Sequence, residues 1–150
     1  MNSPLSLRPF VGGLFLLTAV ALTPADTAAQ SYANTVWSQL QSVYDRASSN
    51  GYSSKHYLLS TLEDDGTDQW NFSFEAGAEY QIVGVCDEDC SDLDLTVKTT
   101  SGTVIDSDTS SDDVPIVTIR PPGNGHYTIE AKMYNCSSEP CYYGIGLFKK

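Results

Sequence analysis

Basic residues are scarce in this chain of 150 residues. It has 8 lysines and arginines against 19 aspartates and glutamates, which gives a formal net charge of −11 at pH 7. Proteins bind nucleic acids and anionic lipid surfaces mainly by neutralising phosphates with Lys and Arg. The composition therefore argues against nucleic acid and favours cations, basic protein surfaces or neutral ligands. A carboxylate-rich surface is also a general adaptation to high salt, and composition alone leaves that explanation open.

The sequence also lacks the common motifs of hydrolases. It contains neither an H-E-x-x-H zinc motif nor a G-x-S-x-G nucleophile elbow, and its only histidines are His56 and His126. Its carboxylates are so numerous that no pair stands out as the acid and base of a glycosidase. We assign no catalytic residue and expect a protein that is not an enzyme.

Long apolar runs are absent except near the N-terminus. Residues 11–22 (VGGLFLLTAVAL) follow Arg8 and fall short of the roughly 20 apolar residues that a membrane span needs. Small residues precede a cleavage point after Ala29. We therefore predict that residues 1–29 are a cleaved signal peptide. The mature chain is then secreted or periplasmic and not inserted in a membrane.

Cysteine is limited to four residues. In an exported chain, an even number of cysteines predicts disulfides rather than free thiols. Sequence alone allows three pairings, and the spacing favours local ones because each close pair brackets a short polar loop. A zinc site built on four thiolates is the alternative, but C-x3-C and C-x4-C are not its usual spacings. The favoured disulfides are Cys86–Cys90 and Cys136–Cys141.

One amphipathic helix is predicted within residues 30–52. Apolar side chains recur there at spacings of three and four, which is the pattern of a helix with one buried face. We expect this apolar stripe to cap one end of the domain that follows. A docking surface for another protein is the alternative, to which Trp37 would contribute. The stripe consists of Tyr32, Val36, Leu40, Val43, Tyr44 and Ala47.

The remaining chain, residues 53–150, predicts an all-β domain. Short runs with alternating apolar and polar residues are separated by turns rich in Gly, Pro, Asp and Ser. In DLDLTVK, for example, Leu93, Leu95 and Val97 share one face of the strand. This pattern predicts an antiparallel β-sandwich of about eight strands. The predicted strands are 55–62, 69–75, 79–86, 92–99, 103–108, 114–120, 125–134 and 142–148.

Several motifs follow one another in this region. They are Trp70-x-Phe72, AGAEYQIVG, the DLDL strand, a Ser-Gly turn, P-x-G-x-G-x-Y-x-I from Pro121, and Tyr143-Gly144. Taken in order, they resemble the bacterial pre-peptidase C-terminal domain, a jelly-roll-like β-sandwich often appended to secreted proteases. The resemblance implies an accessory role in secretion, localisation or the binding of structural proteins or polysaccharide. No peptidase domain precedes the matching region in this sequence.

An acidic segment, CDEDCSDLD, provides a candidate metal site. Calcium takes six to eight oxygen ligands, which carboxylates in tight loops can supply. The resemblance adds that some similar domains use calcium to order their acidic loops. A solvated acidic loop is the alternative, and DSDTSSDD at residues 106–113 is a weaker second acidic group. The candidate ligands are Asp87, Asp89, Asp92 and Asp94.

Three tyrosines flank the second cysteine loop and are candidate ligand-binding residues: Tyr134, Tyr142 and Tyr143. Exposed tyrosine is a common platform for sugars and protein surfaces. Neighbouring residues of a strand point to opposite faces, so Tyr142 and Tyr143 should not both be buried.

Together these features predict a secreted, non-catalytic binding or adhesion module with calcium as a candidate cofactor. Its expected partner is an extracellular protein or a polysaccharide. A structural envelope protein without a specific ligand is one alternative, and a small secreted hydrolase is another.

Overall fold

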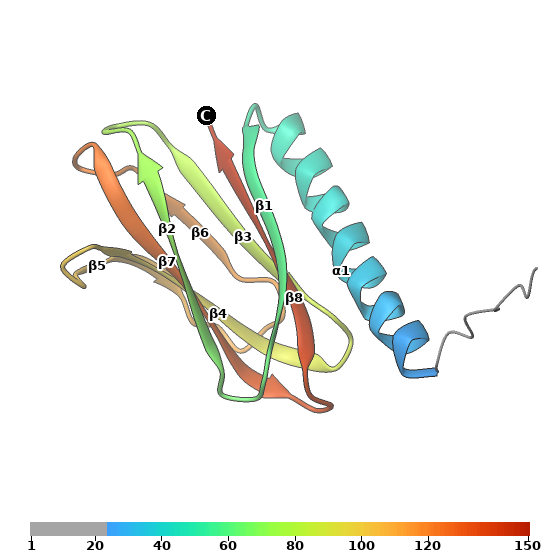
Figure 1. Ribbon diagram of the computed structural model, residues 1–150. Coiled ribbons are helices and arrows are strands. Elements are labelled where there is room, and N and C mark those ends of the chain that lie inside the picture. Colours follow the sequence, from blue (N-terminus) through green and yellow to red (C-terminus); the bar gives the residue numbers. More distant parts are fainter. Residues whose placement is uncertain (1–23) are drawn as a thin grey trace, which may run out of the picture.

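The computed structural model describes residues 24–150 and contains one helix and eight strands (Figure 1). All eight predicted strands are present. The predicted signal peptide lies mostly outside the described residues. The elements are α1 (Pro24–Ser49), β1 (Ser53–Leu62), β2 (Thr67–Phe74), β3 (Tyr80–Cys86), β4 (Cys90–Thr99), β5 (Val104–Asp108), β6 (Ile116–Ile119), β7 (Gly125–Cys136) and β8 (Cys141–Lys149).

The strands form two antiparallel four-stranded sheets with the orders β1-β8-β3-β6 and β2-β7-β4-β5. The first strand, β1, pairs with the last, β8. The intervening strands pair in the same nested order: β2 with β7, β3 with β6, and β4 with β5. Such nested pairing describes one long hairpin wrapped into two sheets, which is the jelly roll. The predicted jelly-roll-like β-sandwich is therefore confirmed.

The core lies between the two sheets and follows the alternation of the sequence. Leu93, Leu95 and Val97 of β4 are fully buried, as are Ile129 and Met133 of the neighbouring β7. The intervening side chains of β4 and β7 lie on the outer face of that sheet. The period of two in these strands therefore separates core from surface as predicted.

The helix covers the outer face of the other sheet and lies along β1 and β8 (Figure 1). The buried stripe residues Val36, Leu40 and Ala47 pack there against Val85 and Phe148. The expectation that the helix caps one end of the sandwich is wrong. Because both faces of β3 and β8 are covered, these central strands are buried almost throughout instead of alternating.

The bounds of α1 differ from the expected ones at the N-terminal end. The helix begins at Pro24, a residue type that fits the first turn of a helix. The predicted cleavage after Ala29 therefore falls within α1, and it stays a prediction. At the other end Gly51 has a φ of 82° and Tyr52 donates its amide to the Ala47 carbonyl, so the helix stops there.

A glycine in β8 allows the helix to approach the sheet. A β carbon at Gly144 would lie 2.7 Å from Leu40 Cδ1 and 2.9 Å from Val36 Cγ1. We expect Gly144→Ala to lower the free energy of unfolding by about 1 to 2 kcal/mol, because two helix side chains must shift. Gly123→Ala is the control, since no atom lies within 4 Å of a β carbon there. Urea denaturation followed by circular dichroism measures both, and equal losses would contradict this packing.

Candidate functional site

Four loops meet at one end of the sandwich, opposite the C-terminus (Figure 1). They join β1 to β2, β3 to β4, β5 to β6 and β7 to β8, and they contain residues 63–66, 87–89, 109–115 and 137–140. Hydrogen bonds tie three of them together: the Asp64 amide donates to Glu139 Oε1 at 2.8 Å, and the Ser137 amide donates to the Asp89 carbonyl at 2.8 Å. The β5–β6 loop is held to β4, where the Leu93 amide donates to the Asp112 carbonyl at 3.0 Å. Since odd and even connections of a jelly roll emerge at opposite ends, the fold gathers these loops.

These loops are acidic and contain no lysine or arginine, and we call this region the acidic end. At the opposite end carboxylates are paired: Lys149 Nζ lies 2.6 Å from Glu75, and Arg120 lies 2.5 Å from Glu79. The charge of the molecule is therefore polarised along its length. The acidic end comprises Glu63, Asp64, Asp65, Asp87, Glu88, Asp89, Asp112, Asp113 and Glu139.

Asp87 is a buried clamp at the start of the β3–β4 loop. Only 2% of it is exposed, and its carboxylate accepts hydrogen bonds from the amides of Tyr142 at 2.7 Å and Asp89 at 3.2 Å. The Cys86–Cys90 disulfide closes the same loop, and Cys136–Cys141 closes the adjacent β7–β8 loop. Both favoured disulfides are thus present, and Asp87 holds the two loops together.

The four candidate calcium ligands do not converge. Asp89 lies beside Tyr32 of α1 and raises the pKa of that phenol, whereas Asp92 and Asp94 lie on the outer face of β4. Within residues 24–150, no three His, Cys, Asp or Glu side chains are arranged to hold a metal ion. The expectation that they share one ion is not met by this arrangement, because the loop and the strand direct their carboxylates to different places. Calcium binding itself stays a prediction.

Asp92 and Asp94 instead line an open groove of about 480 Å³, which we call the Asp94 groove. Its other lining residues are Tyr134 of β7 and Thr109 and Ser111 of the β5–β6 loop. Asp94 is only 8% exposed. Burial, followed by the negative charges of Asp92 and Asp108, raises the pKa of Asp94.

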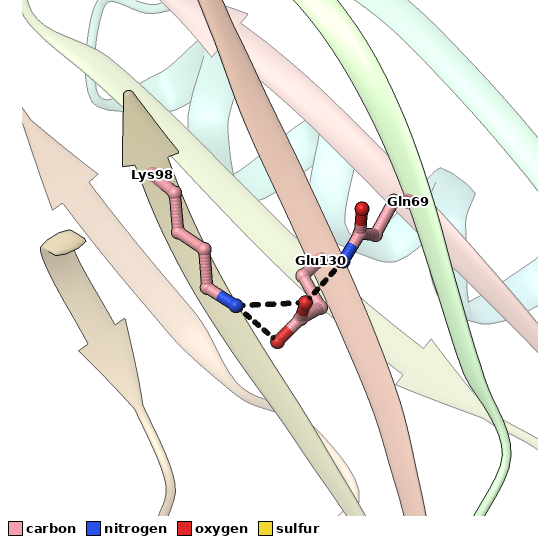
Figure 2. A network of polar contacts seen from close by, with 3 residues as sticks. All are labelled: Gln69, Lys98 and Glu130. Atoms are coloured by element: carbon pink, nitrogen blue, oxygen red, sulfur yellow. Dashed lines mark hydrogen bonds and ion pairs between the residues drawn. The ribbon is translucent and has the colours of Figure 1, made fainter. Parts of the chain in front are cut away.

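A carboxylate further along the same sheet face has the opposite environment. Glu130 of β7 accepts hydrogen bonds from Lys98 at 2.7 and 2.8 Å and from Gln69 at 2.5 Å (Figure 2). Burial opposes ionisation of Glu130, but the bonds from Lys98 and Gln69 outweigh it and lower its pKa. The outer face of β4 and β7 therefore has one satisfied carboxylate and, nearer the acidic end, two with little compensation.

The three candidate tyrosines have different positions. Tyr134 is 48% exposed at the rim of the Asp94 groove. Tyr143 is wrongly predicted as a ligand-binding residue: it is fully buried in the core, where its hydroxyl donates to Asp68 at 2.9 Å. Tyr142 is half-buried because it stacks on Tyr32 of the helix, with ring centroids 6.2 Å apart. The helix covers the face that alternation alone would leave open.

Two further features were not found from the sequence. Ser73 and His126 lie 3.2 Å apart (Oγ to Nδ1) on β2 and β7, which only strand register could bring together. Both are exposed, and no carboxylate among the described residues is hydrogen-bonded to His126, so the pair lacks the orienting group of a triad.

The second feature is an apolar groove of about 260 Å³ beside α1, which Trp37, Tyr44 and Tyr57 line.

No protein-family model matches the chain, and no curated protein matches it in sequence. The structure of PliG from Aeromonas hydrophila, a periplasmic lysozyme inhibitor of g-type lysozyme, matches with a TM-score of 0.48 and 14% identity. The match covers 67% of this chain and 90% of that chain. A likeness this distant does not imply a shared ligand. The resemblance to the pre-peptidase C-terminal domain stays a prediction.

Among the described residues, no helix combines the length and the apolar character that crossing a membrane requires.

Proposed function

We propose that this chain is an exported, non-catalytic binding module that captures a basic protein surface with its acidic end. The observation that carries the proposal is the concentration of carboxylates in four adjoining loops, where Asp65 alone among the nine forms an ion pair within residues 24–150, with Lys132 at 3.5 Å. Such a distribution attracts a cationic partner over a Debye length and orients it before contact. Two disulfides and the Asp87 clamp hold the loops in place, so little ordering is needed on binding.

The polarity of the charge favours this function over a general adaptation to salt. A solubility adaptation needs acidic residues anywhere on the surface, whereas here the carboxylates at the opposite end are paired with Lys149 and Arg120. A structural protein without a ligand likewise does not require a negative electrostatic field concentrated at one end of the molecule. The pre-peptidase C-terminal resemblance supports an accessory binding role of the same kind.

We expect the purified protein to bind immobilised cytochrome c, a small basic protein, with an affinity that falls steeply as salt rises. The double variant Glu88→Gln, Asp113→Asn should bind about tenfold more weakly, because two exposed charges of the acidic end are lost. Asp45→Lys on α1 changes the net charge by the same amount and should alter binding less than about twofold.

Surface plasmon resonance at several salt concentrations measures these differences. Cytochrome c with acylated lysines is the control partner, since it keeps its fold and loses its positive charge. Equal effects of the two variants would show that overall charge and not the acidic end governs binding. Absence of binding at low salt would favour the structural protein without a specific ligand.

A further inference from the structure

The Asp94 groove differs from the rest of the acidic surface because its two aspartates, one of them buried as a residue, have no hydrogen-bond or ion-pair partner among the described residues. Asp94 is 8% exposed, and its surroundings among the described residues act on it through burial and charge, with no hydrogen bond to its carboxylate. Oδ1 of Asp92 is also buried without a partner. Buried charges without partners are costly, and in native proteins such groups call for a functional explanation.

The nearest cation of the chain does not fill this deficit. Lys132 faces Asp94 in the β4–β7 register and lowers its pKa, but burial and neighbouring carboxylates outweigh this effect. The amine of Lys132 lies 3.5 Å from Asp65 and 3.8 Å from the centre of the Tyr134 ring. It is therefore engaged at the rim and leaves the two carboxylates free to receive another cation.

The shape of the groove favours an organic cation over a metal ion. Its volume of about 480 Å³ is far larger than one ion, and no three metal-ligating side chains converge there or elsewhere in residues 24–150. A guanidinium group is planar and carries five N–H donors, which can serve two carboxylates at once. Tyr134 is half exposed at the rim, and because Lys132 lies over one face of its ring, the opposite face is the one on which a guanidinium can stack.

We propose that the Asp94 groove is the pocket for an arginine side chain of the basic partner. This proposal rests on the proposed function and adds a specific anchor to it. Asp92 and Asp94 accept the guanidinium hydrogen bonds, and Tyr134 covers one side of the group. Thr109 and Ser111 also line the groove, and their hydroxyls supply further acceptors. The exposed loops then steer the partner, and the groove selects it.

The test uses the full protein and N-acetylarginine methylamide, titrated by NMR. We expect shifts at Asp94 and Tyr134, and at least about tenfold weaker binding of the citrulline analogue, which has the same shape without the charge. Asp94→Asn should weaken binding of the arginine probe at least about tenfold, since charge-assisted hydrogen bonds are lost. Glu88→Gln removes the same charge outside the groove and should change the affinity for the arginine probe less than about twofold.

Three outcomes would overturn the proposal. The first is an arginine probe that causes no shifts although cytochrome c still binds through the acidic end; the proposed function then stands without this anchor. The second is equal binding of the arginine and citrulline probes. The third is calcium that shifts the same signals and displaces arginine, which would make the groove an ion site. Tyr134→Ala, at an exposed position, gives a second variant should Asp94→Asn fail to fold, and it should weaken the arginine probe about threefold.

Discussion

Replacing Phe148 with alanine is expected to lower the free energy of unfolding by about 3 to 5 kcal/mol. Phe148 is fully buried although it lies on the outer face of its sheet. It packs in a cluster with Ala47 of the helix and Val83 of β3, and its ring meets that of Tyr57 edge-on with centroids 5.9 Å apart. The truncated side chain would leave a cavity between two layers that cannot close without moving the helix.

Denaturation by urea, monitored by circular dichroism under non-reducing conditions, measures this loss. Phe148→Leu is the matched control, because it keeps most of the apolar volume and should cost less than about 1.5 kcal/mol. A loss below about 1 kcal/mol for the alanine variant would mean that the helix contributes little to the stability of the sandwich.

The second large effect concerns Asp87, for which we expect Asp87→Ala to cost about 2 to 3 kcal/mol. The substitution removes the acceptor of the Tyr142 and Asp89 amides and leaves the first of these without a partner between two loops. Asp87→Asn keeps one acceptor oxygen and should cost less. If Asp87 serves as a clamp and not as a metal ligand, the loss is the same in millimolar calcium and in EDTA.

The pH dependence of the same variants gives an independent check. Burial raises the pKa of Asp87, and the hydrogen bonds from Tyr142 and Asp89 only partly offset this. The stability that this group contributes is therefore fully present below its ordinary pKa and is lost as the pH rises through its raised value in the folded state. The free energy of unfolding of Asp87→Asn should accordingly be closer to, or further above, that of the wild type at neutral pH than in acid. A wild-type advantage that grows towards neutral pH would mean that the two amide hydrogen bonds outweigh burial, which would contradict the raised pKa of Asp87 but not the clamp. An Asp87→Ala loss that appears only with calcium would contradict the clamp.

Most of the fold could be predicted from local patterns. Strands with one wet face, such as β4, show a clean alternation, and turn residues separate all eight. The helix was visible from its stripe, but its place was not. Alternation places Val85 and Phe148 on the outer face of a two-layer sandwich. Only the packed helix explains why these two apolar side chains are buried. The helix layer also explains Tyr142. Alternation places Tyr143 in the core and Tyr142 on the outer face of the sheet, and Tyr142 is half-buried there because the helix covers that face.

The candidate site could be predicted only in part. The sequence identifies acidic segments and the residues within them, yet it treats Asp87, Asp89, Asp92 and Asp94 as one group because they are close along the chain. In the structure a loop and a strand separate them. Asp94 and Tyr134 line the same groove because β4 pairs with β7, and proximity in sequence cannot indicate that pairing.

The sequence by itself determined the acidic charge, the eight strands, the helix and the local disulfides, because each depends on composition or on spacing within a few residues. Only the tertiary structure decided that four acidic loops share one end and that Asp94 is buried without a partner. Nested pairing of distant strands brings those loops together, and strand register sets which side chains line the groove. Both depend on contacts far apart in the chain.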